Sequence, residues 1–344
     1  MKAKSAPTDF ARCVTRFLTS HLPGERNLSP QTIKSYSLSL KMFIEHLNHS
    51  AKIKPERIEL KDVTADRVKA FLASLGELSV ISPNTHNQRL SALKTFARYA
   101  ILEQPAFIQD GQRILAIPSK RGFAHEIIYL EKDAMKALLT VPDQTASRGR
   151  RDLAIIAMLY DTGARVQELI SLKVKDVRLA KPETVMLFGK GRKMRAVPIM
   201  SETAKIVESY MRDRGFLEQS ACGDLYLFSS TNRAQFTRPG IAKILKKYLA
   251  AAKAANLEIP FPKDIHPHAL RASKAIHLLE SGVNIIAIRD FLGHASVATT
   301  QVYLRVNNQT KRDAITQAYP SLAEAIPAWR ENCDLMMLLK DLCS

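Results

Sequence analysis

The pattern of apolar residues changes near residue 111, and this change constrains the fold more than any other feature of the sequence. Before it, apolar residues recur at helical spacing; after it, helical segments are interspersed with short candidate strands. The residues in between, 111–124, are rich in glycine, proline, serine and basic residues, which is typical of an interdomain linker. A chain of 344 residues is long enough for two separate cores. We therefore predict a helical domain over 1–112, a linker over 113–124 and a second domain over 125–344.

The first domain is predicted to contain four helices. One lies around residues 10–18, and the others begin at Ser29-Pro30, Thr64 and Ser82-Pro83. The pattern Ser-Pro-x-Thr opens two of them, which has two interpretations. It marks two independent helix starts, or it places two positive helix N-termini against phosphates.

The second domain is predicted to be mixed, with helices around a small antiparallel sheet. Helices are expected near 131–140, 150–161, 165–172, 201–213, 238–256, 267–281, 284–292, 296–305, 311–318 and 321–342. Strands are expected at 176–179, 184–188 and 195–199, with a glycine-containing turn at 189–193. The predicted fold class is therefore mainly α with a small antiparallel sheet. Residues 321–344 are expected to form an apolar helical tail, which docks on a neighbouring protomer or packs against its own domain.

The net charge indicates a polyanionic partner. Lysine and arginine number 51 against 33 acidic residues, a formal charge of +18, and nucleic acid is the simplest partner for such a surface. The apolar run Leu153–Tyr160 is far shorter than a membrane span, and no secretory signal is visible. Cysteines at 13, 222, 333 and 343 lack metal or disulfide spacing. We expect a cytoplasmic protein without metal, cofactor or membrane contact.

Several side chains of the second domain are candidates for phosphate chemistry. Arg165 follows a glycine break at a helix start, with Glu168 on the same face. Lys190 lies in the strand-to-strand turn, and His268 and Arg271 are three residues apart on one helix. Each has an ordinary structural interpretation: an ion pair for Arg165 and Glu168, a solvated tip for Lys190, and a core or cap position for His268.

Two more candidates lie further along the chain. His294 follows a helix stop at Leu292-Gly293, and Tyr303 comes nine residues later. A tyrosine on an amphipathic helix usually serves packing. Its phenol, with a pKa near 10, attacks phosphorus poorly unless nearby positive charge favours the phenolate, and arginines and histidines supply that charge.

Together these residues resemble the site of the tyrosine recombinase (phage integrase) family, which includes the Xer, Cre and lambda-type enzymes. The matching motifs are Thr-Gly-x-Arg-x-x-Glu-Leu, Gly-Lys-Gly before a basic strand, His-x-Leu-Arg, Leu-Gly-His and the tyrosine. The likeness covers nearly the whole chain, with a helical SAM-like core-binding domain before the catalytic domain. One departure is Ala272-Ser273 after Arg271, where family members commonly have histidine and a small hydroxyl residue.

The resemblance implies cleavage and rejoining of duplex DNA at a specific core site. It implies that Tyr303 forms a 3′-phosphotyrosine, Arg165 and Arg271 hold the phosphate, His268 accepts a proton or bonds the same oxygens, His294 adds a hydrogen bond, Lys190 protonates the leaving oxygen and Glu168 orients the site. It implies a homotetramer exchanging strands through a Holliday junction, with accessory directionality factors as further partners. Candidate DNA contacts are Thr32, Lys34, Thr85, Arg89, Lys120, Arg121, Arg192 and Lys193.

Three alternatives remain open at this point. A type IB topoisomerase-like enzyme shares the tyrosine chemistry but needs neither a chosen sequence nor synapsis. A sequence-specific DNA-binding protein with an inactive site is the second alternative. A helical interaction protein without DNA contact is the third, and the charge of +18 argues against it.

Overall fold

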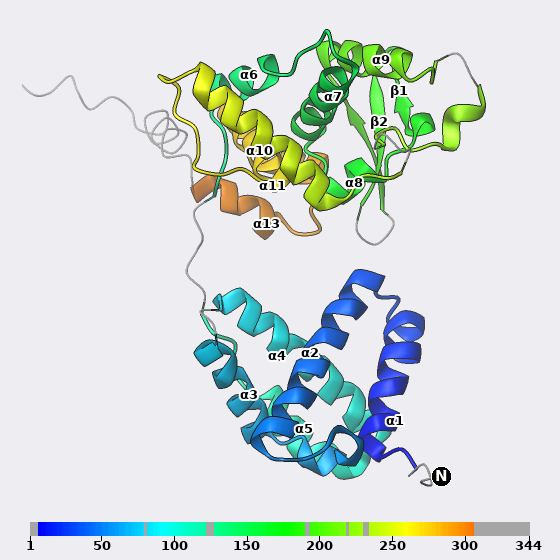
Figure 1. Ribbon diagram of the computed structural model, residues 1–344, viewed down its shortest axis with the longest axis vertical. Helices are drawn as coiled ribbons and strands as arrows, with labels where there is room; N and C mark the ends of the chain where they lie inside the picture. The colour runs from blue at the N-terminus through cyan, green and yellow to red at the C-terminus, as the bar shows by residue number, and fades with distance from the viewer. Residues whose placement is uncertain are drawn as a thin grey trace, which may run out of the picture. The chain divides into compact units, whose positions relative to one another are not determined.

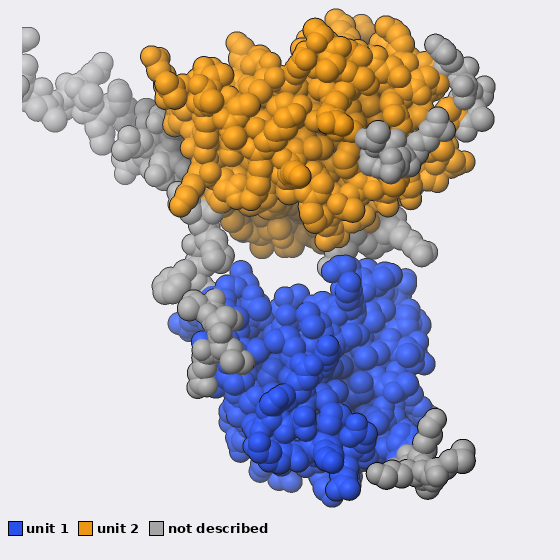
Figure 2. All heavy atoms as spheres, viewed as in Figure 1, with its two compact units in different colours: residues 1–125 blue, residues 126–344 orange. Residues whose placement is uncertain are grey.

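The computed structural model describes residues 6–78, 81–121, 127–189, 193–217, 220–229 and 234–305. The chain divides into two compact units, Met1–His125 and Glu126–Ser344, which Figure 2 shows in different colours. Each unit has its own buried cluster of apolar side chains. In the described part of the chain, none of the helices combines the length and the apolar character that a membrane crossing requires.

The described elements of the first unit are all helical (Figure 1). Its α-helices, within the described residues, are α1 (Asp9–Arg16), α2 (Pro30–Ser50), α3 (Ala65–Leu78), α4 (Pro83–Glu103) and α5 (Ile108–Leu115). A π-helical segment, Phe17–Glu25, continues α1, and short 3-10 turns occupy Pro55–Arg57, Leu60–Asp62 and Pro105–Phe107. Four of these helices were predicted from apolar spacing and are confirmed; α5 and the π-helical segment were not predicted.

The two Ser-Pro-x-Thr sequences are confirmed as helix starts. Ser29 caps α2 and Ser82 caps α4, each accepting a hydrogen bond from the backbone N–H three residues on, at 3.3 and 3.2 Å. In each case the serine hydroxyl also bonds the threonine hydroxyl, so the same local chemistry is built twice. Caps of this kind satisfy N–H groups that have no partner inside the helix.

The predicted linker begins too early. We expected residues 113–124 to connect the domains, with Gly111 as a break, but α5 runs through Leu115 with Ile114 buried, and Ile117 just beyond its end is buried too. Gly111 is buried because α5 packs closely on α4: a Cβ at this position would lie 2.5 Å from Cγ1 of Ile101. This glycine therefore permits helix packing and does not end a domain.

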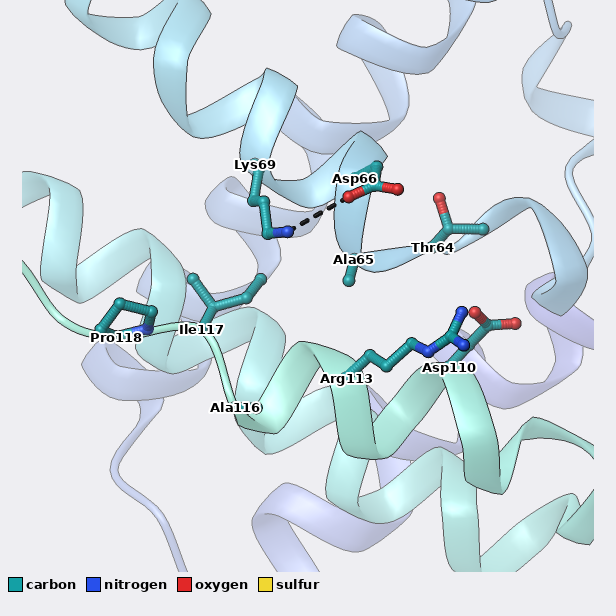
Figure 3. Close-up of a pocket in the computed structure, with 9 residues that line it drawn as sticks. All are labelled: Thr64, Ala65, Asp66, Lys69, Asp110, Arg113, Ala116, Ile117 and Pro118. Atoms are coloured by element: carbon teal, nitrogen blue, oxygen red, sulfur yellow. Dashed lines mark hydrogen bonds and ion pairs between the residues drawn. The ribbon is translucent and has the colours of Figure 1, made fainter.

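A pocket of about 590 Å³ lies between the start of α3 and the end of α5 (Figure 3). Asp66 and Lys69, paired at 3.2 Å, line one side, and Arg113 and Asp110 line the other. None of the residues predicted to bind DNA or to act in catalysis lines it.

The second unit places a three-stranded antiparallel sheet among helices (Figure 1). Its described α-helices are α6 (Lys132–Thr140), α7 (Ser147–Thr162), α8 (Val166–Ile170), α9 (Ser201–Asp213), α10 (Arg238–Ala255), α11 (Pro267–Glu280), α12 (Ile285–Leu292) and α13 (Val297–Gln301). The strands are β1 (Val177–Arg178), β2 (Thr184–Phe188) and β3 (Met194–Pro198), in that order. Turns of 3-10 helix occupy Val174–Asp176, Ser220–Asp224 and Val302–Arg305. The predicted fold class is confirmed, whereas the helices expected at 311–318 and 321–342 lie outside the described residues.

Two predicted elements are shorter than expected. The strand expected at 176–179 is reduced to two residues, because Val174–Asp176 form a 3-10 turn whose Asp176 carboxylate accepts the N–H of Lys173 at 2.9 Å. The helix expected at 165–172 starts at Val166 and ends at Ile170, with Arg165 in extended backbone as its N-cap.

The core of the second unit surrounds α7. Its apolar run from Leu153 to Leu159 is buried throughout, and the helix contacts α6, α8, α9 and α11. In the sheet, residues alternate between faces: Val185 and Leu187 of β2 point inward, opposite Val197 and Arg195 of β3. The alternation therefore places an arginine on the inner face of the sheet.

Candidate active site

Arg165 lies at a sharp turn between two helices. Helix α7 ends at Gly163, whose φ of +56° allows a left-handed cap, and α8 begins three residues later. The Arg165 backbone N–H donates to Oε2 of Glu168 at 2.9 Å, and its guanidinium donates to Oε1 at 2.8 Å. The prediction that Glu168 shares a face with Arg165 is confirmed.

Arg271 lies on α11 and is almost completely buried, with 1% of its surface exposed. Its two terminal nitrogens donate to the carbonyls of Gly163 at 2.7 Å and Leu292 at 2.6 Å, so one side chain connects the ends of α7 and α12. Its Nε has no hydrogen-bond partner among the described residues. Burial, and then the charge of Arg165, lower the pKa of Arg271 to about 10, so it remains a cation at neutral pH.

Arg195 joins the cluster from the sheet. Its guanidinium donates to both oxygens of Glu168, at 3.1 and 2.7 Å, and its Nε donates to the carbonyl of Phe291 at 3.2 Å. Burial raises the pKa of Glu168, but the hydrogen bonds and charges of Arg195 and Arg165 outweigh this and hold the pKa below its ordinary value. We did not predict Arg195; its position on the inner face of β3, two residues before buried Val197, is the signal that could have identified it.

This cluster carries an excess of positive charge. Among the described residues, the hydrogen bonds of Arg165, Arg195 and Arg271 reach one carboxylate only, that of Glu168. Arg165 is the most exposed of the three, with 36% of its side chain accessible. Guanidinium groups offer paired donors that match phosphate oxygens, so the arrangement suits an oxyanion.

Two histidines face these cations and are neutral at pH 7. Burial, and then the charge of Arg271, lower the pKa of His268. Burial, followed by the charges of Arg271 and Arg165, lowers the pKa of His294 to about 4. His294 follows Gly293, the left-handed cap of α12, and its Nδ1 lies 2.9 Å from Oγ1 of Thr300.

Tyr303 lies on the 3-10 turn that follows α13. The helix expected at 296–305 is this pair of elements, and the Ser296 side chain caps its start. The tyrosine is buried in a cluster with Ala272 and Ile276 of α11, and its ring stacks with that of His294 at 6.5 Å between centroids. Burial raises the pKa of Tyr303, and the charges of Arg271 and Arg165 act against this increase.

The structure thus brings together five of the six predicted catalytic residues, with Glu168 beside them. The sixth, Lys190, lies outside the described residues, as does Arg192. Gly189, the last described residue before them, lies close to the cluster, since a Cβ at this position would lie 3.4 Å from Oε1 of Glu168. Lys193 is exposed, and its carbonyl accepts the N–H of Gly189 at 2.8 Å.

The other predicted DNA contacts belong to the first unit. Thr32 and Thr85 occupy the two matching helix starts, and Lys34 is exposed near the first of them. Arg89 is half-buried and donates to the hydroxyl of Ser39 at 3.1 Å, which ties α4 to α2. Lys120 and Arg121 are both exposed, and the Lys120 backbone forms two hydrogen bonds with the Asn87 side chain. The predicted tail, 321–344, lies outside the described residues.

Comparisons with known proteins cover both units. Residues 129–310 match the model of the phage integrase family, and residues 14–104 match that of the phage integrase N-terminal SAM-like domain. The chain is 31% identical to an integrase/recombinase of Sinorhizobium fredii over 97% of this chain and 98% of that protein. It is also 31% identical to the tyrosine recombinase XerC of Oceanobacillus iheyensis, over 87% and 93% of the two chains.

Solved structures show the same fold. The site-specific recombinase XerH, bound to a palindromic difH substrate in a post-cleavage complex, aligns with a TM-score of 0.65 at 22% identity over 85% of this chain and 81% of that one. The Tn1549 transposon integrase, in complex with transposon right end DNA, aligns with a TM-score of 0.65 at 16% identity over 88% and 98%. With its five motifs, its arginine cluster and these matches along both units, the chain belongs to the phage integrase family of tyrosine recombinases.

Proposed function

We propose that this protein is a site-specific DNA recombinase that cleaves and rejoins duplex DNA through a covalent bond to Tyr303. The observation that carries the proposal is the excess of guanidinium charge over carboxylate around Arg165 and Arg271, next to that phenol. Binding of DNA is supported by the relatives, since XerH and the Tn1549 integrase are both described in complex with DNA.

In the first step, the phenolic oxygen attacks the scissile phosphorus and displaces the 5′-oxygen, which leaves a 3′-phosphotyrosine. Arg165 and Arg271 hold the non-bridging oxygens, where negative charge accumulates as phosphorus becomes five-coordinate. Preorganised donors of this kind are worth on the order of 3 kcal/mol each, or a hundredfold and more in rate. Because Arg271 is anchored to two carbonyls, it need not reorganise when the charge forms.

Proton transfer needs an acceptor and a donor. Neutral His268 accepts the phenolic proton, because its lowered pKa leaves a ring nitrogen free at pH 7. Lys190 protonates the departing 5′-oxygen from the turn between β2 and β3. Glu168 keeps Arg165 in place through its two hydrogen bonds.

The phosphotyrosine bond conserves the energy of the broken phosphodiester. A 5′-hydroxyl from a partner duplex reverses the attack and joins new strands, so the cycle runs without hydrolysis of a nucleotide. Two such exchanges proceed through a Holliday junction and require four active sites, which we propose are supplied by a homotetramer on DNA. The tail at 321–344, with its run of leucine and methionine, contacts the neighbouring protomer, and accessory factors set direction.

The test uses a nicked suicide duplex that carries the protein's own site, found first by selection from a random library. We expect a covalent adduct that survives denaturant with the unaltered protein and none with Tyr303→Phe. The matched control is Tyr226→Phe, which alters an exposed tyrosine and should leave the adduct intact. Specific binding without any adduct would indicate an inactive DNA-binding protein and would refute the proposal.

A second assay separates recombination from relaxation. Two duplexes with marked sites are incubated together, and a supercoiled plasmid without a site is tested in parallel. Exchange of flanks between the marked duplexes is expected. Relaxation of the plasmid without exchange would instead indicate a topoisomerase-like activity.

A further inference from the structure

The contact between His294 and Thr300 determines which nitrogen of the histidine carries its proton. His294 Nδ1 lies 2.9 Å from Oγ1 of Thr300, and the threonine is 1% exposed. A neutral imidazole has one N–H and one bare nitrogen, so the partner of Nδ1 fixes the role of Nε2. The geometry alone permits either direction of donation, and the surroundings of the hydroxyl decide between them.

Among the described residues, the hydroxyl of Thr300 has one hydrogen-bond partner, Nδ1 of His294. Other helical threonines of this chain, among them Thr15, Thr95 and Thr162, donate to the carbonyl four residues earlier. Thr300 makes no such bond in the described structure, and His294 is the hydrogen-bond partner of its side chain there. A buried hydroxyl left without an acceptor is costly, so its proton points at Nδ1. This direction of donation makes Nδ1 the bare nitrogen of His294 and places the N–H on Nε2, which is the premise of the proposal below.

Burial, and then the charges around His294, keep the ring in this neutral form. Arg271, Arg165 and Arg195 all act against a further proton, as does neighbouring His268 when it is protonated. No carboxylate hydrogen bonds to the ring in the described part of the chain. Nε2 makes no hydrogen bond to any described residue, which leaves its N–H available to a ligand.

We propose that Thr300 is a positioning residue that holds His294 as the Nε2–H tautomer, so that His294 donates a hydrogen bond to an oxygen of the scissile phosphate and cannot accept the phenolic proton. This inference rests on the proposed function and assigns proton acceptance to His268 alone. Thr300 also precedes Tyr303 by three residues, across the junction from α13 to its 3-10 turn. The same short segment therefore orients the phosphate donor and carries the nucleophile.

The first test reads the tautomer directly and does not depend on activity. The full-length protein is labelled with ¹⁵N-histidine, and the His294 signals are identified by their loss in His294→Gln. We expect a protonated Nε2 and a bare Nδ1 in the unaltered protein and in Thr300→Ser, which retains the hydroxyl. In Thr300→Val, which has the same shape but no donor, the signals should move toward a mixture of tautomers. A protonated Nδ1 in the unaltered protein would overturn the inference without recourse to any variant.

The second test measures the rate of adduct formation on the nicked duplex. Thr300→Val should slow cleavage about tenfold, Thr300→Ser should restore most of the rate, and Thr300→Val should add nothing in a His294→Gln background. A slowing of similar size in that background would show that Thr300 acts independently of His294. If the unaltered protein forms no adduct while its spectrum shows the Nε2–H form, the proposed function fails and the tautomer assignment stands.

Discussion

Replacing Arg195 by methionine tests whether the buried ion pair between Arg195 and Glu168 stabilises the structure around Arg165. Methionine keeps an unbranched apolar stem but removes both hydrogen bonds to Glu168 and the one to the Phe291 carbonyl. Only 3% of the Glu168 side chain is exposed, so water cannot replace the lost partner. The variant therefore retains a buried carboxylate with half of its hydrogen bonds.

The expected loss of stability follows from the partners that remain. Removing one member of a buried pair costs about 3–5 kcal/mol, and the bonds from Arg165 put this case at the low end, about 3 kcal/mol. For a unit of this size, a loss of 1 kcal/mol lowers the melting temperature by roughly 2–4 °C, so the second unit of the variant should melt roughly 6–12 °C lower. Calorimetry of the full chain measures this directly.

The loss of stability in Arg195→Met should depend on pH, and it should decrease as the pH falls. In the unaltered protein the folded-state pKa of Glu168 is below its unfolded value, so the carboxylate stabilises the fold above about pH 4.3 and this contribution disappears as the pH falls through the folded pKa. Without Arg195, burial is less well offset and the folded pKa rises. The difference between variant and unaltered protein should therefore be largest at pH 7.5 and shrink toward pH 5.

A control and a second variant make the reasoning refutable. Arg212→Met removes an exposed pair with Glu208 and should change stability by less than about 1 kcal/mol. Adding Glu168→Gln to Arg195→Met removes the stranded charge and should abolish the pH dependence. A loss in Arg195→Met no larger than in the Arg212 control, or one equal at both pH values, would contradict the account.

Four further predictions concern separate parts of the chain. Gly111→Ala should destabilise the first unit by about 1–3 kcal/mol in thermal unfolding, because its Cβ meets Ile101, whereas Gly24→Ala, with nothing within 4 Å, should not; equal effects would refute the packing argument. With a pKa of about 4, His294 stays neutral from pH 5.5 to 8, so His294→Gln should lower the cleavage rate by a constant factor across that range, and a ratio that changes with pH would contradict this. Affinity for DNA, measured by fluorescence anisotropy, should fall steeply and linearly on a log–log plot against salt; a flat response would exclude electrostatic binding. Deleting 328–344 should leave DNA binding intact but abolish assembly in sedimentation experiments, and unchanged recombination would refute a role in docking.

In the second unit, the sequence predicted best those features that depend on local signals alone. Gly163 and Gly293 have positive φ and end α7 and α12. The helix ends predicted from the sequence therefore lie directly before the segments that carry Arg165 and His294. Pro267 opens α11 and thereby sets the common face of His268 and Arg271. These features depend on a few consecutive residues, which is why a single sequence was enough.

The features that were missed depend on partners distant in the chain. Arg195 meets Glu168 across 27 residues and Phe291 across 96. Strand alternation could have placed its side chain on the inner face of the sheet, but it does not indicate these partners. Gly111 was interpreted as a break because the sequence does not show that Ile101 of the neighbouring helix needs the space. The role of Thr300 likewise depends on whether its hydroxyl turns to its own helix or to His294, which spacing cannot tell.

The carbonyls of Gly163 and Leu292, which anchor Arg271, determine when the arginine cluster can form during synthesis of the chain. Arg271 needs both of them, and they are separated by more than a third of the polypeptide. As a nascent chain leaves the ribosome, Arg165 emerges long before the second of these acceptors exists. A chain that ends before Leu292 lacks one of the two anchors of Arg271, so the arginine cluster is complete only once α12 has been synthesised.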